Sequence, residues 1–224
     1  MIANALFSRQ SKAKGFTLLE LLIVITILAI LAVIIIFVLN PAETLRKSRD
    51  VQRMSDLATL KNAISLYTTT KTSPILDGGT NTLCVGGSGA DSLWVSYPSD
   101  SPGASLSVPP SGFAWVQVLN ANLYKVDGTG WLKVDLGSIS GGSPISNLPV
   151  DPSNTVTTAS AVTNSDLMYR YTCGLTNLLY ELNARMESTA FLTDDNKAVK
   201  DGGNNTKLYE VGTSLTLLAG TDDF

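Results

Sequence analysis

A single carboxylate, that of Glu20, interrupts a long apolar segment near the start of the chain. From Phe16 to Leu39 there are 24 residues, and Glu20 is the only charged one among them. As an α-helix with about 1.5 Å of rise per residue, this segment spans roughly 36 Å, enough to cross the hydrocarbon core of a bilayer. A charge there costs about 2.5–3.5 kcal/mol at the bilayer centre and less near the interface. Because Glu20 is present in spite of this cost, we expect it to have a function and a charged partner.

The apolar segment is longer than the core of a cleaved secretory signal, which is about 7–15 residues. It therefore predicts a membrane-spanning helix. One alternative is a plain N-terminal anchor, in which Glu20 extends to the membrane surface and is favoured by the positive end of the helix.

The composition excludes several kinds of active site. The chain of 224 residues has no histidine, which excludes Ser-His and Cys-His catalysis and histidine metal ligands. Its two cysteines form no CxxC pair, and its net charge of -3 gives no electrostatic case for binding nucleic acid. The chain also has no G-x-S-x-G or phosphate-loop motif. The sequence therefore predicts that the protein is not an enzyme.

The residues before the apolar segment complete a specific motif. Residues 1–15 read MIANALFSRQSKAKG and carry Arg9, Lys12 and Lys14 without an acidic residue. Gly15 follows them, and the apolar segment opens with FTLLE. This combination resembles the class III signal of type IV prepilins and type II secretion pseudopilins.

The resemblance implies how this region is processed and used. Residues 1–15 would be a leader that prepilin peptidase removes between Gly15 and Phe16, after which the new amine of Phe16 is N-methylated. Glu20 would pair with that amine, within one subunit or across to a neighbour, and set the register of assembly. The implied partners are copies of the chain, related pilins, the peptidase and the inner-membrane assembly platform. The implied location is the inner membrane, with the leader cytoplasmic and the C-terminal head outside, and then a filament.

Pro41 follows the apolar segment and predicts a kink, because proline within a helix removes a backbone hydrogen bond. The type IVa pilin pattern has its proline earlier, at the position that Phe37 occupies. The alternative is that Pro41 opens a second helix after a break.

Residues 42–69 predict an amphipathic helix that continues the membrane-spanning one. Together the two parts would form a helix from Phe16 to about Tyr67. The apolar positions expected to face the head recur at near-helical spacing, with Leu57 and Leu60 widening the stripe. They are Leu45, Val51, Met54, Ala58, Ile64 and Tyr67. The run RKSRD could instead contact lipid headgroups, although its interleaved acids weaken that interpretation.

Residues 71–224 predict an exported, β-rich head. The clearest strand pair is 167–173 with 177–188, and the second strand alternates so that one of its faces should be wet. Further strands are expected at 131–136, 207–211 and 215–218, while FAWVQVLNANLY (113–124) could be a short helix. The predicted fold class is α+β, with a long N-terminal helix, membrane-spanning over 16–40 and amphipathic over 41–70, packed against a small antiparallel sheet.

Two further predictions concern the head. Cys84 and Cys173 are expected to form a disulfide, because the head would be exported and the number of cysteines is even. The Leu-Pro-x-Asp-Pro element at 148–152 is similar to one that major pseudopilins carry.

The late loop TDDNKAVKDGGNNT is rich in oxygen-bearing side chains. Asp194, Asp195, Asn196 and Asp201 are candidate calcium ligands there, and the resemblance adds to this, since some major pseudopilins bind calcium in a late loop. The spacing is not that of an EF-hand, and a solvated acidic loop is the alternative. No other cofactor is expected.

Two functions from different classes remain. The first is a structural subunit of a type II secretion pseudopilus or a type IV pilus-like filament. The second is a membrane-anchored binding module for adhesion or DNA uptake, or a minor tip pilin, since loops can carry such roles without a signature.

Overall fold

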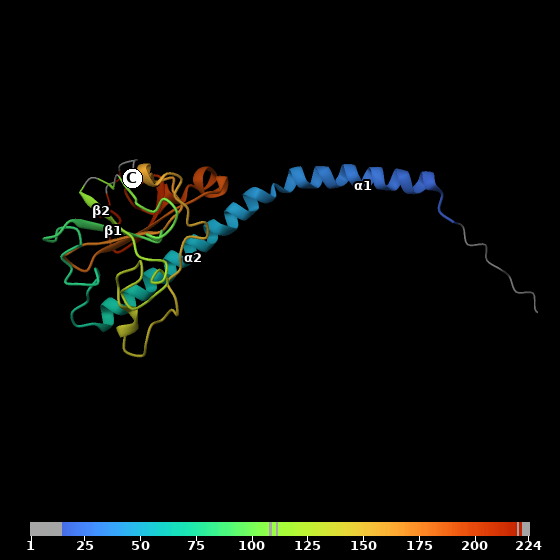
Figure 1. The fold of residues 1–224 in the computed structure, drawn as a ribbon. Helices are drawn as coiled ribbons and strands as arrows, with labels where there is room; N and C mark the ends of the chain where they lie inside the picture. Colours follow the sequence, from blue (N-terminus) through green and yellow to red (C-terminus); the bar gives the residue numbers. More distant parts are fainter. Residues whose placement is uncertain (1–14, 108, 111, 219, 221–224) are drawn as a thin grey trace, which may run out of the picture. The chain divides into compact units, whose positions relative to one another are not determined.

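The computed structural model describes residues 15–107, 109–110, 112–218 and 220 (Figure 1). The chain divides into two compact units, Met1–Ala42 and Glu43–Phe224. Each unit is considered by itself below.

Two helices succeed one another at the start of the described chain. Helix α1 covers Leu18–Leu39 and helix α2 covers Pro41–Thr70. Asn40 separates them in a left-handed conformation, with φ of 37°, which asparagine tolerates better than most residues. Pro41 is then the first helical residue of α2, where its missing N–H costs nothing. The predicted interruption is therefore present, in the form of a break at Asn40 and a new helix.

The head contains a five-stranded sheet. Its strands are β1 (Asp91–Val95), β2 (Phe113–Val116), β3 (Arg170–Cys173), β4 (Tyr180–Arg185) and β5 (Leu208–Gly212), in the order β2-β1-β3-β4-β5. The neighbours β1 and β2 are parallel, and the other three pairs are antiparallel. The α+β prediction and the β3–β4 pair are confirmed. The helix alternative for 113–124 is wrong, because Phe113–Val116 forms the edge strand β2.

Two predicted strands are absent from the described residues. Residues 131–136 form a loop with one isolated bridge, between Asp127 and Asp135, and the side chain of Asp135 then caps a 3-10 helix, Leu136–Ser138. The neighbours Trp131 and Leu132 are both buried, although no strand contains them. Residues 215–218 also form no strand. The remaining short helices are Ala159–Ala161, Ala190–Asp194 and α3 (Lys197–Lys200).

Helix α2 packs against one face of the sheet and forms the main core with it (Figure 1). Leu57, Leu60 and Ile64 are fully buried there with Tyr171 and Leu182. Each such aliphatic side chain contributes roughly 1.5–3 kcal/mol by leaving water.

The predicted apolar stripe of α2 is partly wrong. Leu45 and Val51 are 62% and 50% exposed, and Ala58 is also exposed. The buried face is instead centred on Leu57 and Leu60, which the prediction had placed at its margin. The reason is that the face includes two charged residues, so the hydrophobic pattern alone points in the wrong direction.

The second face of the sheet is covered, so the prediction of a wet face on β4 is also wrong. Glu181 and Asn183 are fully buried. Glu181 accepts hydrogen bonds from the backbone N–H groups of Leu217 and Leu218, at 2.8 and 3.1 Å. Leu218 packs with Leu93 in a separate small core. The C-terminal segment thus covers this face and is held there by its backbone hydrogen bonds to Glu181.

Candidate functional site

Thr17 is the N-cap of α1. The side chain of Thr17 accepts a hydrogen bond from the backbone N–H of Glu20, at 3.2 Å, and Glu20 lies in the first turn of the helix. In this arrangement threonine satisfies one of the unpaired N–H groups, and a glutamate three residues later is favoured by the positive helix end. Phe16, which precedes the cap, is 77% exposed. An amine at Phe16 would therefore stand four residues from Glu20, at the end of a well-defined helix.

The side of α1 is apolar all round. Its leucine, isoleucine and valine side chains, wherever described, are between 44% and 82% exposed. Among the described residues, one helical stretch is long and apolar enough to cross a membrane, and α1 supplies its apolar part. A helix without a polar face must be covered by lipid or by other protein.

A buried group of charges joins α2 to the head. Arg53 donates two hydrogen bonds to Asp151, at 2.7 and 2.8 Å, and one to Asp50, at 2.8 Å. The side chains of Arg53, Asp50 and Asp151 are all fully buried. Asp151 belongs to the Leu-Pro-x-Asp-Pro element at 148–152, so this element contacts helix α2.

Glu187 closes the same group from the end of β4. It lies 2.6 Å from Arg53 and receives two hydrogen bonds from Arg49, at 2.9 and 2.7 Å. Burial disfavours its charge, but the hydrogen bonds from Arg49 and Arg53 outweigh this and lower the pKa of Glu187 to about 2. Burial also disfavours the charge of Arg53, which by itself lowers the pKa of this arginine. The bonds of Arg53 to Asp151 and Glu187 outweigh this and raise its pKa above the ordinary value. We call Asp50, Arg53, Asp151 and Glu187 the docking cluster.

Further contacts extend this attachment along α2. Asp50 accepts the backbone N–H groups of Glu187 and Ser188, and Glu43 accepts that of Thr189. Towards the other end, Tyr169 donates to Asp56 at 2.7 Å. The head is thus attached to α2 from its first turn onward, through polar contacts as well as the core.

The two cysteines are joined in a disulfide. Cys84 and Cys173 are both fully buried, with Cα atoms 4.7 Å apart. The bond ties the loop before β1 to the end of β3.

Three of the four candidate calcium residues have other contacts, and the fourth, Asp194, is exposed. Both carboxylate oxygens of Asp195 pair with lysines, Lys197 and Lys200, and Asn196 caps α3. Asp201 accepts the N–H groups of Gly203 and Glu210, at 2.9 and 2.7 Å, which covers part of the open edge of β5. Over the described residues, no three or more acidic, cysteine or histidine groups come together as a metal site would need. Calcium binding stays a prediction, which titration calorimetry with Ca²⁺ would test.

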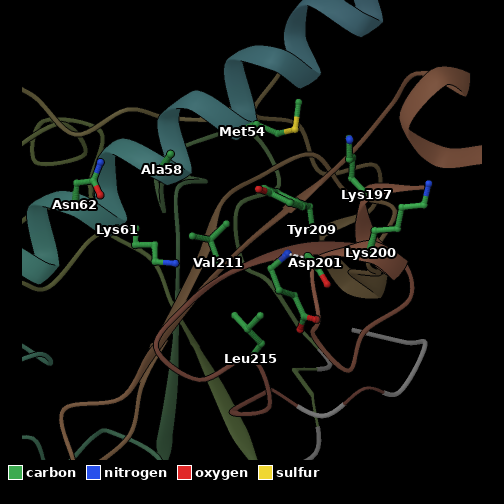
Figure 2. A pocket seen from close by; sticks show the side chains of 11 residues that line it. Met54, Ala58, Lys61, Asn62, Lys197, Lys200, Asp201, Tyr209, Val211 and Leu215 are labelled. Carbon is green, nitrogen blue, oxygen red and sulfur yellow. Dashed lines mark hydrogen bonds between the residues drawn. The ribbon is translucent and has the colours of Figure 1, made fainter. Parts of the chain in front are cut away.

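A groove of about 460 Å³ lies beside α2 in the head (Figure 2). Its walls include Met54 and Ala58 of α2 and Tyr209 of β5. Figure 2 shows Lys61 and Tyr209 projecting into it, while the ammonium groups of Lys197 and Lys200 point away from its centre.

Several of these residues were missed by the reasoning from sequence. The pattern Thr-x-x-Glu at Thr17–Glu20 is a detectable capping signal. Arg53, Asp50 and Glu187 gave no such signal, because charged residues on an amphipathic helix or a strand end are usually solvated. Their role depends on which face of α2 meets the head.

Comparisons with known proteins agree with the N-terminal motif. Residues 10–36 match the family model described as the prokaryotic N-terminal methylation motif. No curated protein and no solved structure matches the chain. The chain therefore carries, at its N-terminus, the class III methylation signal that is typical of type IV pilins and pseudopilins.

Proposed function

We propose that this protein is a pilin-like structural subunit, held in the membrane by α1 and then assembled into a type II secretion pseudopilus or a type IV pilus-like filament. The observation that carries the proposal is the methylation motif directly followed by a helix with a fully exposed apolar surface. In the membrane, lipid covers that surface. In a filament, α1 helices of neighbouring subunits cover it instead.

Processing would occur between Gly15 and Phe16 and leave a methylated, cationic amine on Phe16. Glu20 is the matching anion, and it is the only charge in the apolar segment. An ion pair at low dielectric is strong, but the loss of hydration offsets much of the gain. The main effect of this ion pair is therefore on the specificity of assembly, since only a subunit in the correct register pairs both charges.

The head would remain outside the membrane and form the outer layer of the filament. The docking cluster fixes it to α2, so the helix and the head move together during assembly. Between the two kinds of filament, the Leu-Pro-x-Asp-Pro element favours the pseudopilus, because it resembles one that major pseudopilins carry. In this chain the Asp151 of that element belongs to the docking cluster.

Shearing of cells that express the full chain together with a prepilin assembly system tests this function. Wild-type protein should appear in sheared filaments, and Glu20→Leu should be processed and membrane-bound but absent from filaments. Lys125→Gln, which removes an exposed charge from the head, is the matched control and should assemble normally. Wild-type protein that stays entirely in the membrane would contradict the proposal.

A further inference from the structure

Two acidic side chains meet on the covered face of the sheet. Glu210 of β5 lies opposite Asn183 of β4 in the strand register, so its side chain is on the same face as those of Asn183 and Glu181. Glu181 is fully buried, and Glu210 is 2% exposed. The two carboxyl groups are hydrogen-bonded to each other. Because ionised carboxylates can only accept hydrogen bonds, this contact needs one proton.

The other hydrogen bonds of the pair indicate which glutamate carries the proton. The oxygens of Glu181 accept three N–H groups, two from the backbone of Leu217 and Leu218 and one from a neighbouring side-chain amide. Such donors stabilise the ionised form of a carboxyl group. Glu210 accepts the backbone N–H of Asn205 at Oε2, at 3.1 Å, and no donor among the described residues reaches its buried Oε1. This pattern favours a proton on Oε1 of Glu210, which donates it to Glu181.

No cation of the described residues forms an ion pair with either glutamate. Arg170 of β3 and Arg185 of β4 are on the same face, but both donate to backbone carbonyls. The lysines of α3 bind an aspartate of their own loop, and Lys61 of α2 is exposed. Asp201, in the loop before β5, has the same sign of charge as the pair. A second negative charge would therefore be buried here without a cation, which is costly.

The acidic pair also holds the C-terminal segment, residues 213–218, on the sheet. The backbone N–H groups of the last two residues of this segment are those that Glu181 accepts. Beside them, the side chain of Leu218 is buried in a small core with Leu93 and Leu208. The position of the Glu181 carboxylate therefore sets the position of the segment and the closure of the small core.

The loop before β5 links the acidic pair to the segment a second time. Asn204 donates from its side chain to the carbonyl of Leu218, at 3.0 Å, and the next residue, Asn205, donates its backbone N–H to Glu210. A Cβ atom at Gly203 would lie 1.6 Å from a carboxylate oxygen of Glu210, so the loop fits closely around this side chain. Movement of the Glu210 carboxyl group would therefore disturb both the loop and the segment.

We propose that the proton shared by Glu181 and Glu210 is a latch, which fastens the C-terminal segment to the sheet and releases it when the proton passes to the solvent. With both groups ionised, two carboxylates repel each other in a site of low dielectric. Release of the segment relieves the repulsion, because water then reaches both groups. It also uncovers Leu93 and Leu208, so that the head gains an exposed apolar surface as the pH rises. The latch needs no assembly into filaments, so solubilised subunits are sufficient to test it.

Hydrogen exchange of the full chain in detergent, measured by mass spectrometry, tests the latch. The protection factor compares the measured rate with that of an unstructured peptide at the same pH, which removes the direct effect of pH on exchange. Burial, with Glu181 and Asp201 nearby, raises the pKa of Glu210 from 4.5 to about 8. The latch should therefore weaken between these values by up to about tenfold per pH unit. We expect the protection of residues 213–218 to fall at least tenfold from pH 6 to pH 8, while residues 57–64 of α2 keep theirs.

Glu210→Gln keeps a donor for Glu181 in its amide but has no proton to lose, so the protection of its C-terminal segment should not depend on pH. Asp100→Asn, which removes an exposed carboxylate elsewhere in the head, is the matched control and should respond as the wild type does.

The wild-type measurement is decisive even if the Glu210→Gln variant does not fold. Constant protection of residues 213–218 between pH 6 and pH 8, or an equal loss in residues 57–64, would overturn the inference. A Glu210→Gln variant that keeps the wild-type response would also overturn it. Addition of EDTA at pH 6 should change nothing, whereas a loss of protection would show that a metal ion, and not a proton, joins the two carboxyl groups.

Discussion

Arg53 on α2 and Asp151, 98 positions later, form a two-bonded ion pair in which neither side chain has contact with solvent. Asp151 also accepts the backbone N–H groups of Ser153 and Asn154, at 2.8 and 3.1 Å, so its own position is fixed by the loop. The pair joins the long helix to a loop whose Leu148 and Val150 also pack in the main core. The attachment of the helix to the head therefore depends on charge as well as on apolar contact.

Removal of the arginine should destabilise the head strongly. Arg53→Met keeps most of the side-chain volume but leaves Asp50, Asp151 and Glu187 without their shared cation. Breaking a buried ion pair in this way costs about 3–5 kcal/mol. Denaturant unfolding of the full chain in detergent measures the loss. Arg46→Met, at a side chain that is 53% exposed, should stay within about 0.5 kcal/mol of the wild type. Equal stability of the two variants would show that the docking cluster does not hold the helix.

Acid should weaken the same attachment. The pKa of Glu187 is lowered from an ordinary value of 4.5 to about 2, so its ionised form stabilises the folded state. That contribution is complete above pH 4.5 and is lost as the pH falls through 2. The stability difference between the wild type and Glu187→Gln should therefore be largest near neutral pH and disappear towards pH 2. Thermal melting at a series of pH values measures it, and a difference that does not change with pH would contradict the assignment.

Alkaline conditions should affect the other face of the sheet. Burial raises the pKa of Glu210 from 4.5 to about 8, and the carboxylates of Glu181 and Asp201 add to this. The site is tight, since a Cβ atom at Gly203 would lie 1.6 Å from a carboxylate oxygen of Glu210. A raised pKa means that the protonated form is favoured on folding, so the contribution of Glu210 to stability is complete below pH 4.5 and is lost as the pH rises through 8. Glu210→Gln, which cannot ionise, should remove most of that decline. A wild-type melting temperature that is constant from pH 5 to 9 would disprove this.

Reduction of the disulfide should lower stability without unfolding the helix. Cys84 and Cys173 are 89 positions apart, and a crosslink that closes a loop of that length contributes up to about 4–5 kcal/mol on the chain-entropy model. Dithiothreitol should therefore lower the melting temperature of the wild type. The double variant Cys84→Ser with Cys173→Ser should melt at the reduced wild-type temperature and not respond to the reagent. A wild-type protein that melts equally with and without reductant would contradict the expected contribution.

The sequence predicted those parts of the fold that depend on local pattern. The apolar length of α1, the break before Pro41 and the pairing of β3 with β4 each follow from neighbouring residues, and all three are present. The orientation of α2 could not be predicted in this way. Leu57 and Leu60 face the core, and Val51 and Ala58 face outward, because Asp50 and Arg53 occupy the buried side. Their burial depends on Asp151 and Glu187, which lie about 100 or more positions away. The buried face of β4 depends likewise on Leu217 and Leu218, which a two-residue period does not reveal.

The intact mass and N-terminal sequence of the protein, purified from a membrane that contains active prepilin peptidase, test the central claim most directly. The account predicts a chain that begins at Phe16 and carries one methyl group on its amine. A chain that retains residues 1–15 under those conditions would contradict it. Glu20 would then be an anchor residue at the membrane surface, and the exposed surface of α1 would need only lipid to cover it.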